Sequence, residues 1–410
     1  MSTKQVQDAY IVAATRTPIG KAPRGAFRNT RPDDLLIAAI KSAMKQVPSL
    51  DPAAIEDAIV GCSFPEAEQG MNMARIAVAL CGFPKPVGGV TVNRFCASGL
   101  TAVQMAADRI RVGEADVLIA GGAESMSLVP MGGNKPSFNP EILARDENVG
   151  IAYGMGITAE KVALQWKVSR EAQDAFSLES HLRALKAQAA GEFSDEITPI
   201  DVIERFPELA TGKHGSRTRT ISLDEGPRRD TSLEGLAKLR PVFAAPKDPT
   251  GKSTGMGSVT AGNSSQTSDG AGALILASEK AVKQFDLKPL ARFVGFAARG
   301  VPPEIMGIGP IEAIPAALAY AGLKLDHIGW IELNEAFAAQ SLAVINTVGL
   351  DPAKVNPMGG AIALGHPRGA TGAIRSATVV HALRRRNLKY GMVTMCVGTG
   401  QGAAGIFERV

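Results

Sequence analysis

The stretch VNRFCASGL, residues 92–100, places a cysteine between a strand-like apolar run and a segment with helical spacing of apolar residues. Cys96 is therefore expected at a helix N-terminus. Unpaired backbone N–H groups and the helix dipole at such a position favour a thiolate and lower the pKa of a thiol. Gly99 would let another chain segment or a ligand approach closely. The setting suits a nucleophile, although a buried structural cysteine fits the residue type equally well.

A second segment, GGAIALGHPRGATG at residues 359–372, places His366 among small residues before another helical pattern. A thiol beside an imidazole is the arrangement that activates a cysteine nucleophile. A lone histidine is more often structural, but of the five in the chain only His366 has such surroundings. We therefore expect His366 to act on Cys96 if the fold brings the two together.

Two more residues follow strand-like runs. Cys396 ends an apolar run and enters the turn VGTGQG, where backbone N–H groups can hold an oxyanion beside a thiol. Asn334 follows the run GWIEL, and a polar residue there lies at the carboxyl edge of a parallel sheet, where α/β ligand sites form. The alternatives are a small core residue for Cys396, as we interpret Cys62 and Cys81, and an ordinary helix N-cap for Asn334.

The elements that must position these residues occur twice. Short apolar runs alternate with helical patterns, which indicates an α/β fold with parallel strands. The series that contains Cys96 can be laid over the series that contains His366, and order and spacing agree. We interpret this as a duplicated domain. Pseudo-twofold packing of the halves should then bring the two helix N-termini together.

The halves differ by an insertion. In the second half the last two strands are joined by a tight turn, whereas in the first their counterparts are separated by a long interval rich in Pro, Gly, Ser, Lys and Arg. Such insertions commonly carry binding function. We predict an N-terminal half at 1–125 completed by 256–280, an irregular inserted loop domain at 126–255, and a C-terminal half at 281–410.

Composition narrows the function classes. The chain has 410 residues and a net charge of +4, which suits small anionic ligands but is too diffuse to indicate nucleic acid. No run approaches the roughly 20 apolar residues of a membrane span, and no secretion or peroxisomal signal is apparent. The four cysteines show neither a Cys-x-x-Cys pair nor zinc spacing. We expect free thiols, no metal, and a cytoplasmic location.

Over its whole length the sequence resembles the thiolases, whose signature blocks match VNRFCASGL, NEAFAAQ, GGAIALGHPRGATG and CVGTGQGAAG. The resemblance implies thioester exchange between coenzyme A (CoA) derivatives, with CoA as a substrate and no cofactor. It implies a five-layered αβαβα sandwich of two βαβαβαββ halves with an inserted loop domain that binds CoA.

The resemblance also implies a role for each matching residue. Cys96 would be the nucleophile, His366 its base, and Cys396 the acid/base at the α-carbon of acetyl-CoA. Asn334 would hold a water that forms one oxyanion hole with His366, and the backbone N–H groups of Cys96 and Gly398 would form the other. The implied substrate- and CoA-binding residues are Arg228, Ala261, Ser265, Met155 and Phe337.

Within the family we expect a degradative 3-ketoacyl-CoA thiolase of fatty-acid β-oxidation, acting by a ping-pong mechanism. Gly154 stands where short-chain biosynthetic thiolases commonly have histidine, which should open room for longer acyl chains. The first alternative is a biosynthetic acetyl-CoA C-acetyltransferase. Others are a ketoacyl synthase, which would not be expected to carry Cys396, and a non-catalytic acyl-CoA carrier. A homodimer or homotetramer is expected, with possible docking to a β-oxidation multienzyme partner. Arg368, where an aliphatic residue is common, has no explanation from the sequence.

Overall fold

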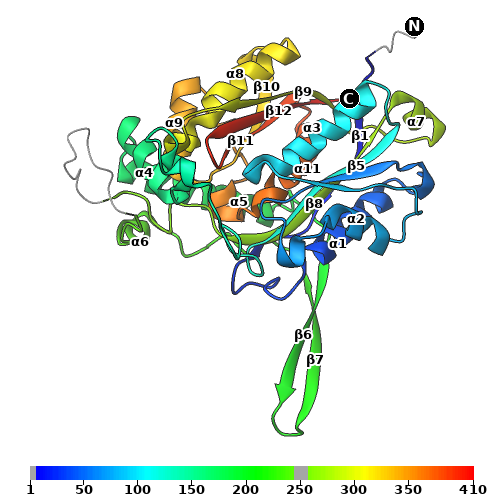
Figure 1. Ribbon diagram of the computed structural model, residues 1–410, viewed down its shortest axis with the longest axis horizontal. Helices are drawn as coiled ribbons and strands as arrows, with labels where there is room; N and C mark the ends of the chain where they lie inside the picture. Colours follow the sequence, from blue (N-terminus) through cyan, green and yellow to red (C-terminus); the bar gives the residue numbers. More distant parts are fainter. Residues whose placement is uncertain (1–5, 244–256) are drawn as a thin grey trace.

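The computed structural model describes residues 6–243 and 257–410 (Figure 1). Its first half sheet has the strand order β1 (Tyr10–Arg16), β8 (Ser268–Ala277), β5 (Val117–Ser125), β3 (Asp57–Gly61) and β4 (Val90–Val92). β8 runs antiparallel to both of its neighbours, whereas β3 is parallel to β5 and to β4. The short β2 (Gly20–Lys21) pairs with the start of β8.

The second half sheet repeats this order with β9 (Ala291–Gly300), β12 (Gln401–Arg409), β11 (Tyr390–Val397) and β10 (Ile328–Leu333). β12 is antiparallel to both neighbours and β10 is parallel to β11. A parallel bridge between Ile331 and Val355 occupies the place of β4. The predicted duplication is confirmed. A short pairing of Tyr10 and Ile11 with Arg292 and Ala291 joins the half sheets at their edges.

Burial on both faces explains why these strands read as nearly continuous apolar runs. In β5, Leu118 packs into the central core and the next residue, Ile119, into the outer core of the first half. Ile59 and Val60 in β3 alternate in the same way. Successive side chains of a strand point to opposite faces, so a sheet covered on both sides needs apolar residues at every position.

Helices supply three layers around the two half sheets. α3 (Ser98–Arg111) and α11 (Arg368–Arg385) contribute to the central core together with strands of both halves. α1 (Pro32–Gln46) and α2 (Met73–Leu80) pack in the outer core of the first half. α8 (Gly309–Ala321) and α9 (Ala338–Val348) do so in the second. This is the predicted five-layered α/β arrangement, and the central helices are the ones that begin near Cys96 and His366.

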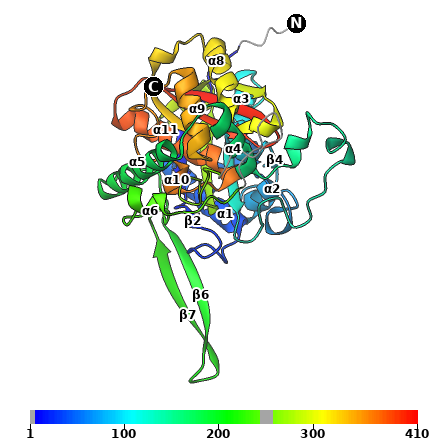
Figure 2. The same cartoon turned by 90° about the vertical axis from the view of Figure 1, so that its left-hand side faces the viewer.

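The chain between β5 and β8 holds α4 (Met155–Gln165), α5 (Arg170–Ala189), β6 (Ile200–Glu208), β7 (Lys213–Ile221) and α6 (Leu233–Ala237). The expectation of an irregular insertion was wrong, because α5 alone has 20 residues. Its buried face carries polar and small side chains such as Gln173, Ser177 and His181, so no apolar period marks it. β6 and β7 form a hairpin that projects from the body (Figures 1 and 2). The division into domains stays a prediction, and its boundary between residues 255 and 256 lies outside the described residues.

A buried arginine anchors the insertion to the first half sheet. Nε of Arg16 in β1 donates to Oε1 of Glu196 at 2.6 Å. Its two terminal nitrogens donate to the carboxylate of Asp224 at 2.8 and 3.0 Å. The Arg16 side chain is only 1% exposed, so both carboxylates are needed to compensate its buried charge.

The remaining helices are short. α7 (Glu279–Gln284) links β8 to β9, and α10 (Ala361–Leu364) precedes His366. Single 3₁₀ turns are η1 (Pro52–Ala54), η2 (Ala67–Gln69), η3 (Phe95–Ala97), η4 (Pro140–Ile142), η5 (Val149–Ala152), η6 (Pro303–Ile308) and η7 (Leu325–His327). Over residues 6–243 and 257–410, no helix has the length and apolar character needed to span a bilayer.

Candidate active site

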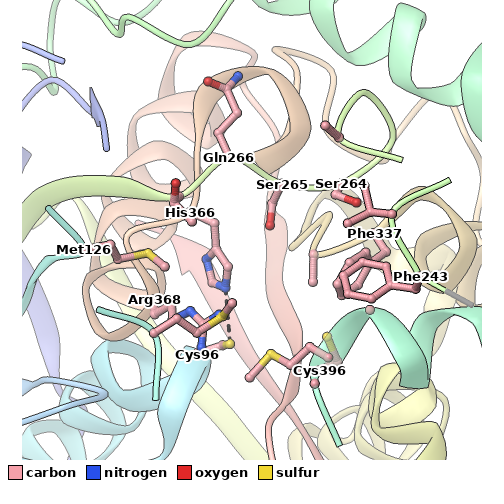
Figure 3. A pocket seen from close by; sticks show the side chains of 18 of the residues that line it. Cys96, Met126, Phe243, Ser264, Ser265, Gln266, Phe337, His366, Arg368 and Cys396 are labelled. Carbon is pink, nitrogen blue, oxygen red and sulfur yellow. Dashed lines mark hydrogen bonds between the residues drawn. The ribbon is translucent and has the colours of Figure 1, made fainter. Parts of the chain in front are cut away.

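Segments far apart in the sequence meet between the half sheets. Cys96 lies in η3 directly before α3, His366 lies two residues before α11, Asn334 follows β10, and Cys396 is near the end of β11. Figure 3 shows Cys96, His366 and Cys396 around one cavity. The structure thus brings together the residues to which the sequence analysis assigned the chemistry.

The turn that carries Cys96 is strained and locked. Phe95 has a φ of 43°, a left-handed conformation that side chains other than glycine rarely adopt. The Ser98 hydroxyl secures the turn, because it accepts from the Arg94 N–H at 2.9 Å and donates to the Phe95 carbonyl at 2.6 Å. Strain that is held by surrounding bonds is typical of functional turns. Cys96 is thereby presented in a fixed orientation at the start of α3.

Glycines allow the two central helices to approach closely. A Cβ on Gly99 would lie 2.5 Å from the backbone nitrogen of Ala373, and a Cβ on Gly372 would lie 2.1 Å from that of Leu100. Each helix therefore fits into the other only because the facing residue lacks a side chain. The close approach expected at Gly99 is confirmed, and the partner is the backbone of α11.

The imidazole of His366 is held from both sides. Its Nε2 lies 3.2 Å from the Cys96 sulfur and 3.3 Å from Nδ2 of Asn334, and its Nδ1 lies 2.7 Å from the Thr371 hydroxyl. A thiol and an amide nitrogen can both donate, so we assign Nε2 as the acceptor and Nδ1–H as the donor to Thr371. The backbone N–H of His366 donates to the Ser268 hydroxyl at 3.0 Å. His366 is therefore oriented with its basic nitrogen toward Cys96.

Burial sets the resting charges of the pair. It lowers the pKa of His366 to about 3, and the positive charges of Arg368 and Arg375 act in the same direction. Burial raises the pKa of the Cys96 thiol, whereas the charge of Arg368 and nearby backbone N–H groups lower it. The expectation of a lowered pKa for Cys96 was wrong, because burial outweighs the helix terminus. The resting pair is a thiol hydrogen-bonded to a neutral imidazole.

Backbone groups face the same sulfur. The N–H groups of Cys96 itself and of Gly398 are close enough to the Cys96 sulfur to lower the pKa of the thiol. Gly398 begins the turn after β11, and a Cβ there would come within 3.2 Å of the Met155 side chain. Two converging N–H groups beside a nucleophile are the donors that an oxyanion hole requires.

Cys396 lies across the same space. It is fully buried with Met306 and Ala336, and it contacts Met155 and Phe337. Burial raises the pKa of its thiol, and the nearby Cys96 adds to this effect. Cys396 is therefore protonated at rest, which suits a group that first donates a proton.

A cavity of about 270 Å³ opens over these residues. Met155, Phe337, Ala261 and Ser265, each predicted from the sequence to bind substrate or CoA, all contribute to its wall. A Cβ on Gly154, which also lines the cavity, would meet nothing within 4 Å. The space that the sequence analysis expected at Gly154 is therefore present.

A second cavity, of about 460 Å³, continues the first. It contains Arg228 and Lys21, and it shares Ala261 and Gln266 with the cavity over Cys96. The Arg228 side chain is 56% exposed and pairs with Asp230 at 2.9 Å, so it can turn toward a ligand at little cost. Arg228 thus lies apart from the cysteines, in a cavity that adjoins theirs.

Several neighbours of the site were missed from the sequence. Thr371 and Ser268 position His366, and no pattern distinguishes them from other hydroxyl residues in loops and helices. Glu335, next to Asn334, is bonded to Ser180, Asn356 and the Ile362 N–H, and it holds the loop before α10 in place. Arg368 lines the cavity beside Cys96 (Figure 3). The only sign of Arg368 in the sequence was a charged residue within a segment of small residues.

Comparison with known proteins supports the same assignment. The family model "Thiolase, N-terminal domain" matches residues 9–280, and "Thiolase, C-terminal domain" matches residues 287–409. The 3-ketoacyl-CoA thiolase of Bacillus subtilis is 48% identical over 98% of this chain and 100% of its own length.

Two solved structures have the same fold. The acetyl-CoA acetyltransferase of Bacillus anthracis superposes with a TM-score of 0.87 at 37% identity, and the match covers 100% of both chains. Human mitochondrial 3-ketoacyl-CoA thiolase in complex with CoA superposes with a TM-score of 0.85 at 38% identity, again over 100% of both chains.

Proposed function

Because this chain belongs to the thiolase family and is an acyltransferase, we propose that it cleaves 3-ketoacyl-CoA with CoA, releasing acetyl-CoA and a chain-shortened acyl-CoA. The observation that carries the proposal is the 3.2 Å contact between the Cys96 sulfur and His366 Nε2, with a second thiol, Cys396, in the same cavity. One thiol would form the acyl-enzyme and the other would move the proton on carbon.

In the first half-reaction His366 takes the proton of Cys96, and the thiolate attacks the 3-keto carbon. The N–H groups of Cys96 and Gly398 receive the oxyanion that forms there. The bond between C2 and C3 then breaks, and its electron pair leaves as the enolate of acetyl-CoA. The enolate oxygen faces His366 and a water held by Asn334, and the Cys396 thiol protonates C2.

In the second half-reaction free CoA gives its thiol proton to the Cys396 thiolate and attacks the acyl group on Cys96. The chain-shortened acyl-CoA leaves, and the proton on His366 returns to Cys96. Atoms and protons balance without a metal or redox cofactor. A covalent intermediate shared by two half-reactions predicts ping-pong kinetics.

CoA fits the channel between the two cavities. We assign its phosphates to the end with Arg228 and Lys21, and its pantetheine arm to the passage by Ala261 and Ser265. A positive charge at that end suits phosphate recognition. The inserted loop domain at 126–255 would then supply much of the CoA site.

The cavity favours the degradative activity. Met155, Phe337 and Phe243 make its wall largely apolar, and the open space at Gly154 leaves room for a longer chain. An acetyl-CoA acetyltransferase is the second candidate, because the likeness to the Bacillus anthracis enzyme is as extensive as that to the human thiolase. The test is the CoA-dependent loss of 3-ketoacyl-CoA over a series that starts at four carbons. Cleavage well beyond four carbons supports the proposal, whereas activity confined to acetoacetyl-CoA transfers the function to the second candidate.

A homodimer or homotetramer is also proposed. The β6–β7 hairpin exposes Ile203, Phe206 and Leu209, with the last 92% exposed. A two-stranded ribbon alone is marginally stable in water, so a second copy that covers these side chains would stabilise it. Light scattering of Leu209→Asp beside the wild type tests this assignment. An unchanged oligomer in the variant would place the interface elsewhere.

Cellular context follows from the same proposal. All four cysteines are free, which suits a reducing compartment. We propose a cytoplasmic enzyme of fatty-acid β-oxidation that docks to a multienzyme partner supplying its substrate. Cell fractionation with activity measurement, followed by size-exclusion chromatography of the native extract, tests location and docking together.

A further inference from the structure

Arg368, the first residue of α11, is a buried charge with no carboxylate partner among the described residues. The residue is only 5% exposed, and neither Nε nor Nη1 has a hydrogen-bond partner among the residues that the structure describes. Its third nitrogen contacts the sulfur of Met131, and the guanidinium lies over the Phe64 ring at 5.7 Å from the centroid. Burying an unpaired cation is costly, so its presence calls for an anion that binds there.

The buried carboxylate close to Arg368, that of Glu124, does not pair with the guanidinium. Glu124 is buried close to Arg368, but its oxygens accept from other groups. Oε2 accepts from the N–H groups of Ser63 and Gly369, each at 2.8 Å, and Oε1 accepts from Gln69. Glu124 therefore ties α11 to the first half sheet and leaves two sides of the guanidinium unmatched.

The position of Arg368 decides where the anion comes from. Arg368 lines the cavity over Cys96 and His366. It is not among the described residues that line the cavity with Arg228, to which we assign the CoA phosphates. Figure 3 shows Arg368 next to Cys96 and Met126, with Cys396, Phe337 and Phe243 farther across the cavity. We therefore assign the anion to the acyl chain of the substrate and not to the CoA phosphates.

Activation of the Cys96 nucleophile does not account for the charge of Arg368. Although it lowers the pKa of the Cys96 thiol, burial has the larger effect and the net pKa is raised. The same charge lowers the pKa of His366, which opposes the proton transfer that the mechanism requires of this base. A carboxylate bound to Arg368 would cancel that unfavourable effect.

We propose that Arg368 binds a carboxylate at the far end of a short acyl chain, so that the preferred substrates are 3-ketoacyl-CoA thioesters with an ω-carboxylate. This inference rests on the proposed thiolase function. A guanidinium binds a carboxylate through two parallel N–H bonds, and Nε and Nη1 are the two nitrogens without partners. The 3-keto carbon lies at Cys96 while the distal carboxylate ends at Arg368.

The first experiment compares six-carbon substrates that differ only at the chain end, 3-ketohexanoyl-CoA with its methyl and 3-ketoadipyl-CoA with its carboxylate. We expect wild-type kcat/KM to be at least about 10-fold higher for the carboxylate. Arg368→Leu should lose about 100-fold on the carboxylate substrate, the scale seen when one partner of a buried charge pair is removed. On the methyl substrate the loss should be at least about 10-fold smaller, because that substrate has no carboxylate whose bonds to Arg368 could be removed. Arg368→Lys should recover part of the preference.

A second experiment follows only the acylation of Cys96, by intact mass, with succinyl-CoA and butyryl-CoA as the matched pair. It does not depend on cleavage of a carbon–carbon bond, so it tests the carboxylate site even if no 3-ketoacyl-CoA is cleaved. Arg299→Leu is the control, because it removes the same charge from an exposed site beside Tyr320. We expect this control to leave both preferences unchanged.

The outcomes separate the two proposals. Wild-type cleavage of the methyl substrate with no preference for the carboxylate, in both experiments, overturns the carboxylate site and leaves the thiolase function intact. Arg368→Leu could also lose activity equally on both substrates, with an alkaline shift in the pH profile of Cys96 alkylation. That result overturns the carboxylate site and shows that Arg368 stabilises the Cys96 thiolate instead. A selective loss on the carboxylate substrates supports the inference.

Discussion

The crossing of α3 and α11 couples packing to catalysis, and Gly99→Ala tests that coupling. The new Cβ would lie 2.5 Å from the Ala373 nitrogen and 3.0 Å from the Gly369 carbonyl oxygen, where ordinary contact begins at 3.4 Å. Both atoms belong to the backbone of α11 and cannot rotate away. The helices must therefore separate, which moves Cys96 relative to His366.

The size of the effect follows from that displacement. A misplacement of about 1 Å in a catalytic pair costs about 100-fold in rate, so we expect kcat/KM for thiolysis to fall by about that factor. Overpacking of a tight core costs about 1–3 kcal/mol, and the better helix propensity of alanine returns about 1 kcal/mol at most. The protein should therefore still fold, with a small decrease in thermal stability.

The assay measures thiolysis together with the rate of Cys96 alkylation by iodoacetamide, which reports the thiol–imidazole contact alone. Gly300→Ala is the matched control, because its Cβ would have no neighbour closer than 4.0 Å. Both rates should fall in Gly99→Ala and stay at the wild-type level in the control. Wild-type kinetics in a folded Gly99→Ala protein would show that the helix spacing does not set the catalytic geometry.

Other predictions concern single residues. Cys96→Ser should form no covalent acyl adduct, and an undiminished adduct seen by intact mass would remove Cys96 from its role. Cys396→Ser should still be acylated by acetyl-CoA but should not condense two acetyl units; condensation at the wild-type rate would contradict the proton-transfer assignment. Since the pKa of His366 is lowered to about 3 and that of Cys96 is raised, alkylation of Cys96 should keep rising with pH above 7. A plateau that begins near pH 6.5 would contradict a neutral resting pair. Arg16→Met should lower the free energy of unfolding by about 3–5 kcal/mol, because two buried carboxylates lose their partner, and chemical denaturation measures this; a change below about 1 kcal/mol would refute it.

The sequence carried enough information for the architecture because the half sheets are buried on both faces. Strands such as β5 and β11 then appear as nearly continuous apolar runs, and their order is the same in both halves. The sequence pattern did not predict α5, because this helix packs against the body through polar and small side chains such as Gln173 and Ser177. Apolar periodicity predicts helices only where the buried face is apolar.

For the site, the sequence by itself determined which residue types stand at corresponding places of a duplicated fold, and so predicted that Cys96 and His366 would meet. The tertiary structure alone decided their charge states, because burial depends on every layer packed around them. It also decided that Thr371 orients the imidazole and that two nitrogens of Arg368 have no hydrogen-bond partner among the described residues. Hydrogen bonds and desolvation depend on distances of a few ångströms between segments distant in the chain, and spacing along the sequence does not contain them.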